Sequence, residues 1–301
     1  MDTRDSPSFD RAAEDAGNIL SLEHCNIRIP EQRPAILFFI EGLGLTRDPY
    51  MHVTDANMWV NAGRNQFHLP TNVRPQVFRG EIAVVVPHLD LVRARLPRLV
   101  ERLAGTAFAW QDAGDTVLAT CPWGNRFRVH APGRFGRMVL GIPCLTFPVP
   151  RGAAAAIGRF YATVLKARVA PLSPGDAEAG AAGVEVRVGV DQVLRFVDTD
   201  QPIAPFDGHH VAIYVADFSG PHQWLAERGL VTEESDPWQY RFDALVDPAS
   251  GECVFQLEHE VRSLSHPMYP RHLALVNRNP VQSQGQYLPG RDAWYAPDRG
   301  A

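Results

Sequence analysis

The stretch LEHCNIRIPEQRPAILFFIEGLGLTRD, residues 22–48, decides the fold. It opens with a run over residues 24–30 that is typical of a β-strand, and it continues with a helix candidate over residues 31–42. The pair Phe38 and Phe39 suits a helix that packs on a sheet, and Gly42-Leu43-Gly44 suits its end. The segment therefore predicts a unit that opens as a strand followed by a helix.

The same order returns three more times along the chain. The four opening runs begin at His24, Glu81, Cys144 and His210, which are 57, 63 and 66 positions apart. Each run is followed by a helix candidate and then by β-rich pieces with turn residues between them, at 57–70, 116–130, 184–197 and 240–258. Each repeat therefore predicts a βαβββ unit.

A βαβββ unit has one sheet face that it cannot cover alone, so we expect units to pair into cupped sheets. The resulting fold class is α+β, with units 1 and 2 forming a first domain at 19–137 and units 3 and 4 a second domain at 138–265. A flexible N-terminal arm (1–18) and an irregular C-terminal tail (266–301) flank them. The tail is either passive or wraps a domain or a partner subunit.

Composition and charge narrow the function classes. The chain has 29 Lys+Arg against 34 Asp+Glu, a net charge of −5, and no run of five basic residues, so nucleic acid is not expected as a partner. Apolar stretches fall far short of the ~18 to 20 residues that cross a bilayer, and the first residues are polar, which predicts a cytoplasmic protein without membrane association. The four cysteines show no C-x-x-C spacing, which favours reduced, buried thiols.

The residues of 20–265 resemble the vicinal oxygen chelate superfamily, which includes glyoxalase I, bleomycin and fosfomycin resistance proteins and extradiol ring-cleaving dioxygenases. The opening segment 22–48 is similar to the family's strand with a leading histidine, its helix with an aromatic pair and its closing Leu-Gly-Leu. Asp207-GHHVAIYV is a second match, and Asp247-PASG resembles the family's turn before the last strand. The resemblance implies two glyoxalase-like domains built from paired modules.

The family binds a divalent metal ion inside a module pair, and the resemblance implies candidate ligands in the first domain. The matching positions are His24, His68 and Glu81. His130 is a further candidate ligand, while Arg128 two residues earlier is a candidate for holding an anionic substrate. Imidazole and carboxylate ligands suit Fe, Mn, Ni or Zn, and the sequence does not distinguish these. The alternative is that these histidines are buried without a metal and Glu81 is a solvated charge.

The second domain presents another candidate set: Cys144, His210 and either Gln256 or Glu258. Ring-cleaving dioxygenases have a histidine where Cys144 stands, and a thiolate beside iron and oxygen would be prone to oxidation. We therefore interpret Cys144 as a small core residue and the second domain as either a degenerate copy or a substrate pocket without metal. The dense run Glu258-His259-Glu260 is interpreted as a charged strand end, with His259 facing opposite to its neighbours.

The leading hypothesis is a metal-dependent enzyme of the lyase or isomerase type acting on a small oxygenated molecule. The metal would act as a Lewis acid, and Glu81 or a displaced ligand would move a proton. One alternative is an extradiol ring-cleaving dioxygenase. Another is a binding protein similar to bleomycin resistance proteins, which sequesters a small molecule without catalysis. Either a monomer or a homodimer is compatible with the sequence.

Overall fold

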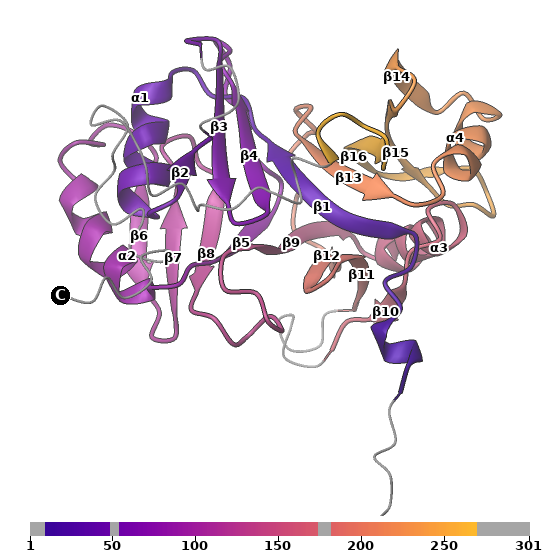
Figure 1. Cartoon of the computed structure of the whole chain (residues 1–301), viewed down its shortest axis with the longest axis horizontal. Helices are drawn as coiled ribbons and strands as arrows, with labels where there is room; N and C mark the ends of the chain where they lie inside the picture. Colours follow the sequence, from indigo (N-terminus) through magenta and orange to yellow (C-terminus); the bar gives the residue numbers. More distant parts are fainter. Residues whose placement is uncertain (1–9, 49–53, 174–181, 270–301) are drawn as a thin grey trace, which may run out of the picture.

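Four βαβββ units follow one another in the computed structural model, which describes residues 10–48, 54–173 and 182–269 (Figure 1). This confirms the expected α+β class. Residues 1–9 of the expected arm and 270–301 of the expected tail lie outside the described residues. Within the described part of the arm, a short 3-10 helix spans Ala12–Glu14.

The elements of each unit keep the same order. Unit 1 consists of β1 (Ile19–Asn26), α1 (Gln32–Ala35) continued by a π-helix over Ile36–Gly42, β2 (Thr46–Arg47), β3 (Asn57–Ala62) and β4 (Asn65–Pro70). Unit 2 consists of β5 (Glu81–Val85), α2 (Leu89–Arg95) continued by a 3-10 helix over Leu96–Leu99, β6 (Ala109–Asp112), β7 (Thr116–Thr120) and β8 (Arg126–His130). Unit 3 consists of β9 (Gly141–Pro150), α3 (Ala153–Thr163), β10 (Val169–Pro171), β11 (Gly183–Gly189) and β12 (Gln192–Thr199). Unit 4 consists of β13 (His210–Val215), α4 (Ser219–Ala226), β14 (Val231–Asp236), β15 (Gln239–Val246) and β16 (Cys253–Ser263).

The strands form two eight-stranded sheets, and neither sheet joins the units that we expected to pair. One sheet has the order β14-β15-β16-β13-β1-β4-β3-β2, and the other has the order β10-β11-β12-β9-β5-β8-β7-β6. The first strands of the units make the junctions, because β1 pairs antiparallel with β13 and β5 pairs antiparallel with β9. Unit 1 therefore shares a sheet with unit 4, and unit 2 shares a sheet with unit 3. The sequence did not predict which units share a sheet, because the first strands of all four units have similar sequence patterns.

Units 1 and 2, and likewise units 3 and 4, are joined through their apolar cores instead. Phe38 and Phe39 of unit 1 lie with their ring centres 5.1 and 5.6 Å from that of Phe127 on β8 of unit 2. In the same way, the ring centre of Phe160 on α3 lies 5.7 Å from that of Phe242 on β15. The aromatic residues of these two helices thus pack on a strand of the next unit. The domain limits 19–137 and 138–265 stay a prediction.

Two buried amide side chains fasten the two sheets to each other. The amide of Asn65 donates to the carbonyl of Leu22 at 2.7 Å and accepts from the N–H of Ile142 at 2.8 Å, so it links β1 with β9. Gln192 donates to the carbonyl oxygens of the same two residues, each at 3.1 Å, and accepts from the Leu22 N–H at 3.2 Å. Asn65 opens β4 and Gln192 opens β12, so two units supply this link from equivalent positions.

Strand β1 contains a β-bulge that changes which side chains share a face. Its register with β13 steps from Leu22 opposite Ile213 to His24 opposite Ala212, so Glu23 is the extra residue. A bulge leaves the extra residue out of the regular alternation and bends the strand. Glu23 therefore reaches the side chain of His24, although the two are neighbours in the sequence.

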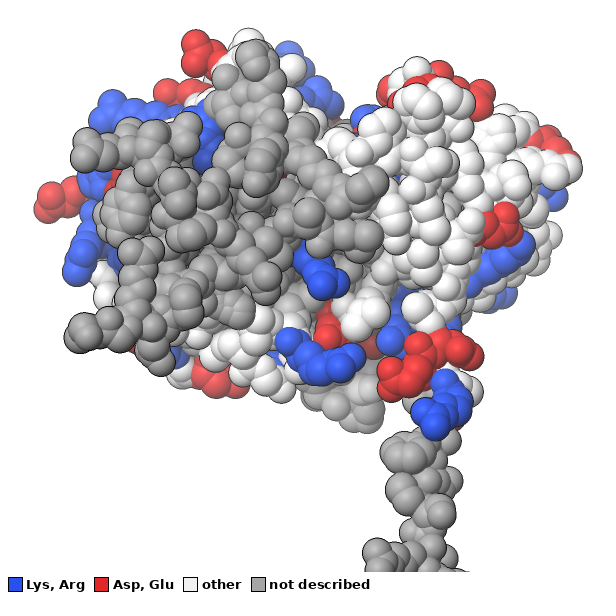
Figure 2. Space-filling model, viewed as in Figure 1, with Lys and Arg blue, Asp and Glu red and all other residues white. Residues whose placement is uncertain are grey.

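The described surface shows no concentration of one charge on the face drawn in Figure 2. Its Lys and Arg atoms and its Asp and Glu atoms form small groups of both signs, at the edge of the face and near its middle. None of the helices in the described ranges has the length and apolar character needed to span a membrane. None of the four cysteines forms a disulfide, and three of them, Cys25, Cys121 and Cys144, are buried as expected.

Candidate metal centre

One face of the sheet that joins units 1 and 4 carries polar side chains on three neighbouring strands. His24 lies on β1, His210 opens β13 and Glu260 lies on β16. Ala212 of β13, the middle strand of the three, stands in register opposite both His24 and Glu260. Side chains at paired positions project to the same face of a sheet, and so do side chains two positions apart on one strand. The two imidazoles and the carboxylate therefore share the face of the small Ala212.

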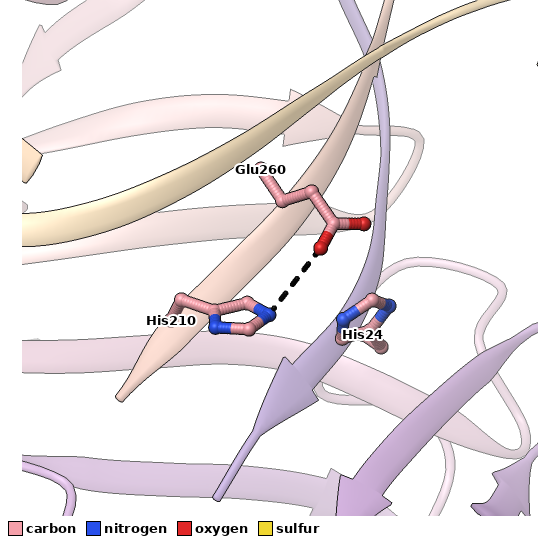
Figure 3. A group of neighbouring side chains, drawn as sticks. All are labelled: His24, His210 and Glu260. Atoms are coloured by element: carbon pink, nitrogen blue, oxygen red, sulfur yellow. Dashed lines mark ion pairs between the residues drawn. The ribbon is translucent and has the colours of Figure 1, made fainter. Parts of the chain in front are cut away.

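The potential ligand atoms of these three side chains converge. One atom from each of His24, His210 and Glu260 lies within 4.8 Å of the others, and Figure 3 shows the rings and the carboxylate close together. His210 Nε2 lies 3.5 Å from Glu260 Oε2. All three are buried, with exposed fractions of 0%, 5% and 3%. Within 10–48, 54–173 and 182–269, this is the one group of at least three His, Cys, Asp or Glu residues that gathers so closely.

The hydrogen-bond inventory of this group fits a metal ion. The Nε2 atoms of His24 and His210 are buried and make no hydrogen bond. Leaving a buried polar atom without a partner costs about 1–3 kcal/mol, so two such atoms beside one carboxylate call for a compensating interaction. Imidazole nitrogens and a carboxylate oxygen are the donors that Zn, Fe, Mn and Ni accept from proteins.

The protonation states of His24 and Glu260 are those that metal binding requires. Burial lowers the pKa of His24, although the neighbouring Glu23 carboxylate acts in the opposite sense. Burial acts to raise the pKa of Glu260, but His210 and the guanidinium of Arg262 outweigh it and hold this pKa well below its usual range. A neutral imidazole with a free lone pair and an ionised carboxylate are the forms that bind metal ions.

Two arginines fix the orientation of the Glu260 carboxylate. Arg241 donates from Nη2 to Oε2 of Glu260 at 2.5 Å, and Arg262 pairs with Oε1. Both guanidinium groups are held by further carboxylates, Glu258 for Arg241 and Glu23 for Arg262. Glu260 is therefore a rigidly placed, ionised group.

His68 lies beside this group but is engaged in other contacts. Its Nδ1 is 2.7 Å from the side-chain amide of Asn26, and its Nε2 is 2.9 Å from Oδ1 of Asn57. Its ring stacks on Trp59 at 3.8 Å, and its centre lies 5.6 Å from that of His24. Burial is the main cause that lowers the pKa of His68 to about 2. His68 thus stands next to the site as a neutral ring whose two nitrogens already have partners.

The other predicted ligands of the first domain lie in the other sheet. Glu81 is on β5, where its carboxylate accepts two hydrogen bonds from Arg128 of β8, at 2.6 and 2.9 Å. His130 is buried at the end of β8, and burial together with nearby arginines lowers its pKa to about 4. The predicted set that combined Glu81 with histidines of unit 1 presumed that units 1 and 2 share a sheet. Because unit 1 pairs with unit 4 instead, the acid beside His24 is Glu260.

The second sheet repeats the geometry of the first with different side chains. Ala83 of β5 stands in register between Cys144 and Arg128. The counterparts in the two sheets are Cys144 for His24, Glu81 for His210 and Arg128 for Glu260. A guanidinium in place of a carboxylate brings positive charge to the position where the first sheet offers negative charge. This difference explains why the possible metal ligands converge in the first sheet.

The alternative set predicted for the second domain is divided by the structure. His210 lies in the group described above, whereas buried Cys144 lies in the other sheet, 3.6 Å from the hydroxyl of Thr146. Gln256 is exposed on β16. The Glu258 carboxylate lies beside Nδ1 of His210, the ring nitrogen directed away from Glu260, with 3.2 Å between Oε1 and Nδ1.

Sequence reasoning missed Glu260 and Glu23. Glu260 was interpreted as part of a charged strand end, yet it is buried two positions beyond Glu258 on the same face. The alternation Glu258-His259-Glu260 was the available signal, because His259 does face the core, 2.6 Å from the hydroxyl of Tyr161. Glu23 gave no such signal, since regular alternation would turn it away from His24.

The fold is similar to that of glyoxalase I, which agrees with the sequence resemblance. No protein-family model and no curated protein sequence matches the chain. Solved structures do match. Glyoxalase I from Zea mays superposes with a TM-score of 0.59 at 15% identity, over 84% of this chain and 95% of that chain. A Bacillus subtilis protein assigned as a dioxygenase superposes with a TM-score of 0.51 at 11% identity, over 83% of this chain and 87% of that chain.

Proposed function

We propose that this protein is a divalent-metal-dependent enzyme whose metal ion is held by His24, His210 and Glu260, and that it acts on a small molecule with two adjacent oxygen atoms. The observation that carries this proposal is the pair of buried imidazole nitrogens without hydrogen-bond partners beside an ionised carboxylate. A bound ion would supply Lewis-acid activation of the substrate oxygens and, if it is iron, a site for dioxygen.

The contribution of the chain is to fix three donors and to leave the remaining positions open. His68 is tied to Asn26 and Asn57, so it does not offer a fourth nitrogen. Two imidazoles and one carboxylate with open positions are typical of non-haem Fe(II) oxygenases. Among the reaction types considered, this donor set favours a ring-cleaving dioxygenase.

The environment of Glu260 supports the same choice. In a lyase or isomerase, a carboxylate that carries protons requires a pKa near the working pH. The pKa of Glu260 is held well below its usual range, and two arginines fix its oxygens. Such a carboxylate is suited to remain a ligand and unsuited to carry protons.

A metal-dependent lyase or isomerase is the second candidate. It is favoured by the likeness to glyoxalase I of Zea mays, which extends over 84% of this chain. Glu258 would then be the acid–base group, because it lies on the same face and is less buried than Glu260. Burial acts to raise the pKa of Glu258, but His210 and Arg241 lower it, less far than the pKa of Glu260 is lowered. Glu81, which the sequence suggested for this role, is bound to Arg128 in the other sheet.

The test begins with elemental analysis of protein purified without a metal-chelating tag. We expect one transition-metal ion per chain, and a rise of about 2.7 kcal/mol in the free energy of unfolding when the free ion is at 100 times its Kd. His24→Ala and His210→Ala should each abolish both effects. His130→Ala is the matched control, since it removes a buried imidazole from the other sheet and should leave metal binding intact.

Activity then separates the two candidates. With Fe(II) and oxygen, a catechol should give the coloured ring-opened product, and the thiohemiacetal of a 2-oxoaldehyde should not be isomerised. The reverse result would establish the lyase or isomerase. Wild-type protein whose metal content and response to added ions match those of His24→Ala would refute the metal-dependent enzyme and favour sequestration of a small molecule.

A further inference from the structure

The two imidazoles of the candidate site share an arrangement at their far nitrogens. His24 Nδ1 is bound by the carboxylate of Glu23, which is fully buried. His210 Nδ1 lies 3.2 Å from Oε1 of Glu258. Each ring therefore has a carboxylate at Nδ1 and, on the side of the group formed with Glu260, an Nε2 atom that makes no hydrogen bond; that of His210 lies 3.5 Å from Glu260 Oε2.

Each of these carboxylates is in turn held by an arginine that also binds Glu260. Arg262 donates from Nη1 to Glu23 at 2.9 Å and pairs through Nη2 with Glu260. Arg241 donates from Nη1 to Glu258 at 2.8 Å and from Nη2 to Glu260 at 2.5 Å. The outer carboxylates thus share their arginines with the carboxylate at the centre.

A carboxylate at Nδ1 determines which ring nitrogen carries the proton. A neutral imidazole has one N–H and one lone pair, and an ionised carboxylate accepts only, so it selects the form with the proton on Nδ1. The lone pair then lies on Nε2, which is the atom available for a metal ion. Such outer carboxylates also fix the ring orientation and raise the basicity of the ligand.

The β-bulge is what makes this arrangement possible on β1. Regular alternation would send Glu23 to the core side of the sheet, where an unpaired carboxylate is costly. The bulge brings it to the polar side, where Arg262 and His24 bind it. On β16 no bulge is needed, because Glu258 and Glu260 are two positions apart and already share a face.

We propose that Glu23 is a positioning residue that holds His24 in the tautomer with a free Nε2, and that Glu258 does the same for His210. This inference rests on the proposed metal centre and assigns that centre an outer layer of two carboxylate–imidazole pairs. Neither carboxylate is a metal ligand; each acts through the ring that it orients.

The experiment compares wild-type protein with Glu23→Gln and Glu258→Gln. Glutamine has the same shape, but its amide both donates and accepts, so it no longer selects one tautomer. We expect each variant to bind Co²⁺ about 10- to 100-fold more weakly in competition with a chelator, with a shifted cobalt absorption spectrum. Tyr161→Phe is the matched control: it removes the partner of a buried imidazole, His259, on the other face of β16, and should leave the affinity and spectrum unchanged.

A second measurement does not depend on metal. Nitrogen chemical shifts of the histidine rings in metal-free protein should show the protons of His24 and His210 on Nδ1, and Glu23→Gln should mix the two tautomers of His24. Protons on Nε2 in the wild type would overturn the inference even if the metal binds. Wild-type protein that binds no Co²⁺ but has Nδ1 protons would refute the proposed function and leave the orienting role of the carboxylates supported.

Folding of the variants is checked by circular dichroism. If Glu23→Gln does not fold, Glu258→Gln alone tests the inference. The side chain of Glu258 is 23% exposed, so its substitution disturbs the core less. A folded Glu258→Gln variant with wild-type cobalt affinity, spectrum and histidine shifts would overturn the inference.

Discussion

Replacing His259 should remove a defined part of the acid sensitivity of the fold. Its ring is fully buried, with Nδ1 2.7 Å from the carbonyl of Leu257 and Nε2 2.6 Å from the hydroxyl of Tyr161. Burial lowers its pKa from 6.5 to about 4. As the pH falls from 6.5 towards 4, the unfolded chain binds a proton at this histidine and the folded chain does not. The free energy of unfolding therefore decreases.

The size of this loss follows from the two pKa values. The full difference of 6.5 − 4, at about 1.36 kcal/mol per pKa unit, gives about 3.4 kcal/mol, of which about 2.6 kcal/mol is lost by pH 4.5. His259→Gln retains an acceptor for Tyr161 and has no titrating ring. We expect the variant to be about 1 kcal/mol less stable than wild type at pH 7, the net value of a typical hydrogen bond, and more stable than wild type at pH 4.5.

Urea denaturation of both proteins at pH 7 and pH 4.5 measures this effect. A chelator is present throughout, so that release of a bound metal at low pH does not contribute. Tyr161→Phe serves as the control, since it removes the hydrogen bond to the ring but keeps the ring, and it should show the full pH dependence. Equal losses of unfolding free energy in wild type and His259→Gln between the two pH values would refute the reasoning.

Three further substitutions test the site and the fold. Ala212→Val should keep the strand but crowd the space between His24 and Glu260, so that the metal-dependent stabilisation of about 2.7 kcal/mol disappears in calorimetry; unchanged stabilisation would contradict the placement of the ion. Gln192→Ala should lower the free energy of unfolding, measured in urea, by about 1–3 kcal/mol for each buried backbone group that it leaves unpaired, and a neutral result would mean that the link between the sheets contributes nothing. Gly80→Ala should cost about 3 kcal/mol in the same assay, because the added Cβ would lie 1.9 Å from the carbonyl oxygen of Thr146 on the neighbouring strand.

Much of the architecture could be predicted from the sequence, because the local sequence of each unit indicates its strands, its helix and its turns. The lead residues Glu81 and His210 mark the start of β5 and β13, whereas β1 and β9 begin before His24 and Cys144. Two of the four lead residues, His24 and His210, do come together. The choice of sheet partners could not be predicted in this way. Four similar units allow several pairings, and the one adopted depends on contacts between segments far apart in the chain, such as β1 with β13.

The acid of the site was missed for a related reason. Glu81 and Glu260 are both carboxylates at inward positions of their strands, and only the pairing of the sheets decides which one meets the imidazoles. Glu23 shows a second limit of pattern reading. A one-residue β-bulge interrupts the alternation of side chains between the two faces of a strand, and the sequence around Leu22 does not predict it.

The pairing of units 1 and 4 also has a consequence for biosynthesis. His24 leaves the ribosome 260 − 24 = 236 residues before Glu260. A nascent chain, or one that terminates early, thus carries one imidazole of the proposed centre and lacks its counterparts on β13 and β16. If the proposed centre holds a metal ion, only a chain translated through β16 captures it, and the stability that the ion adds is withheld from every shorter product.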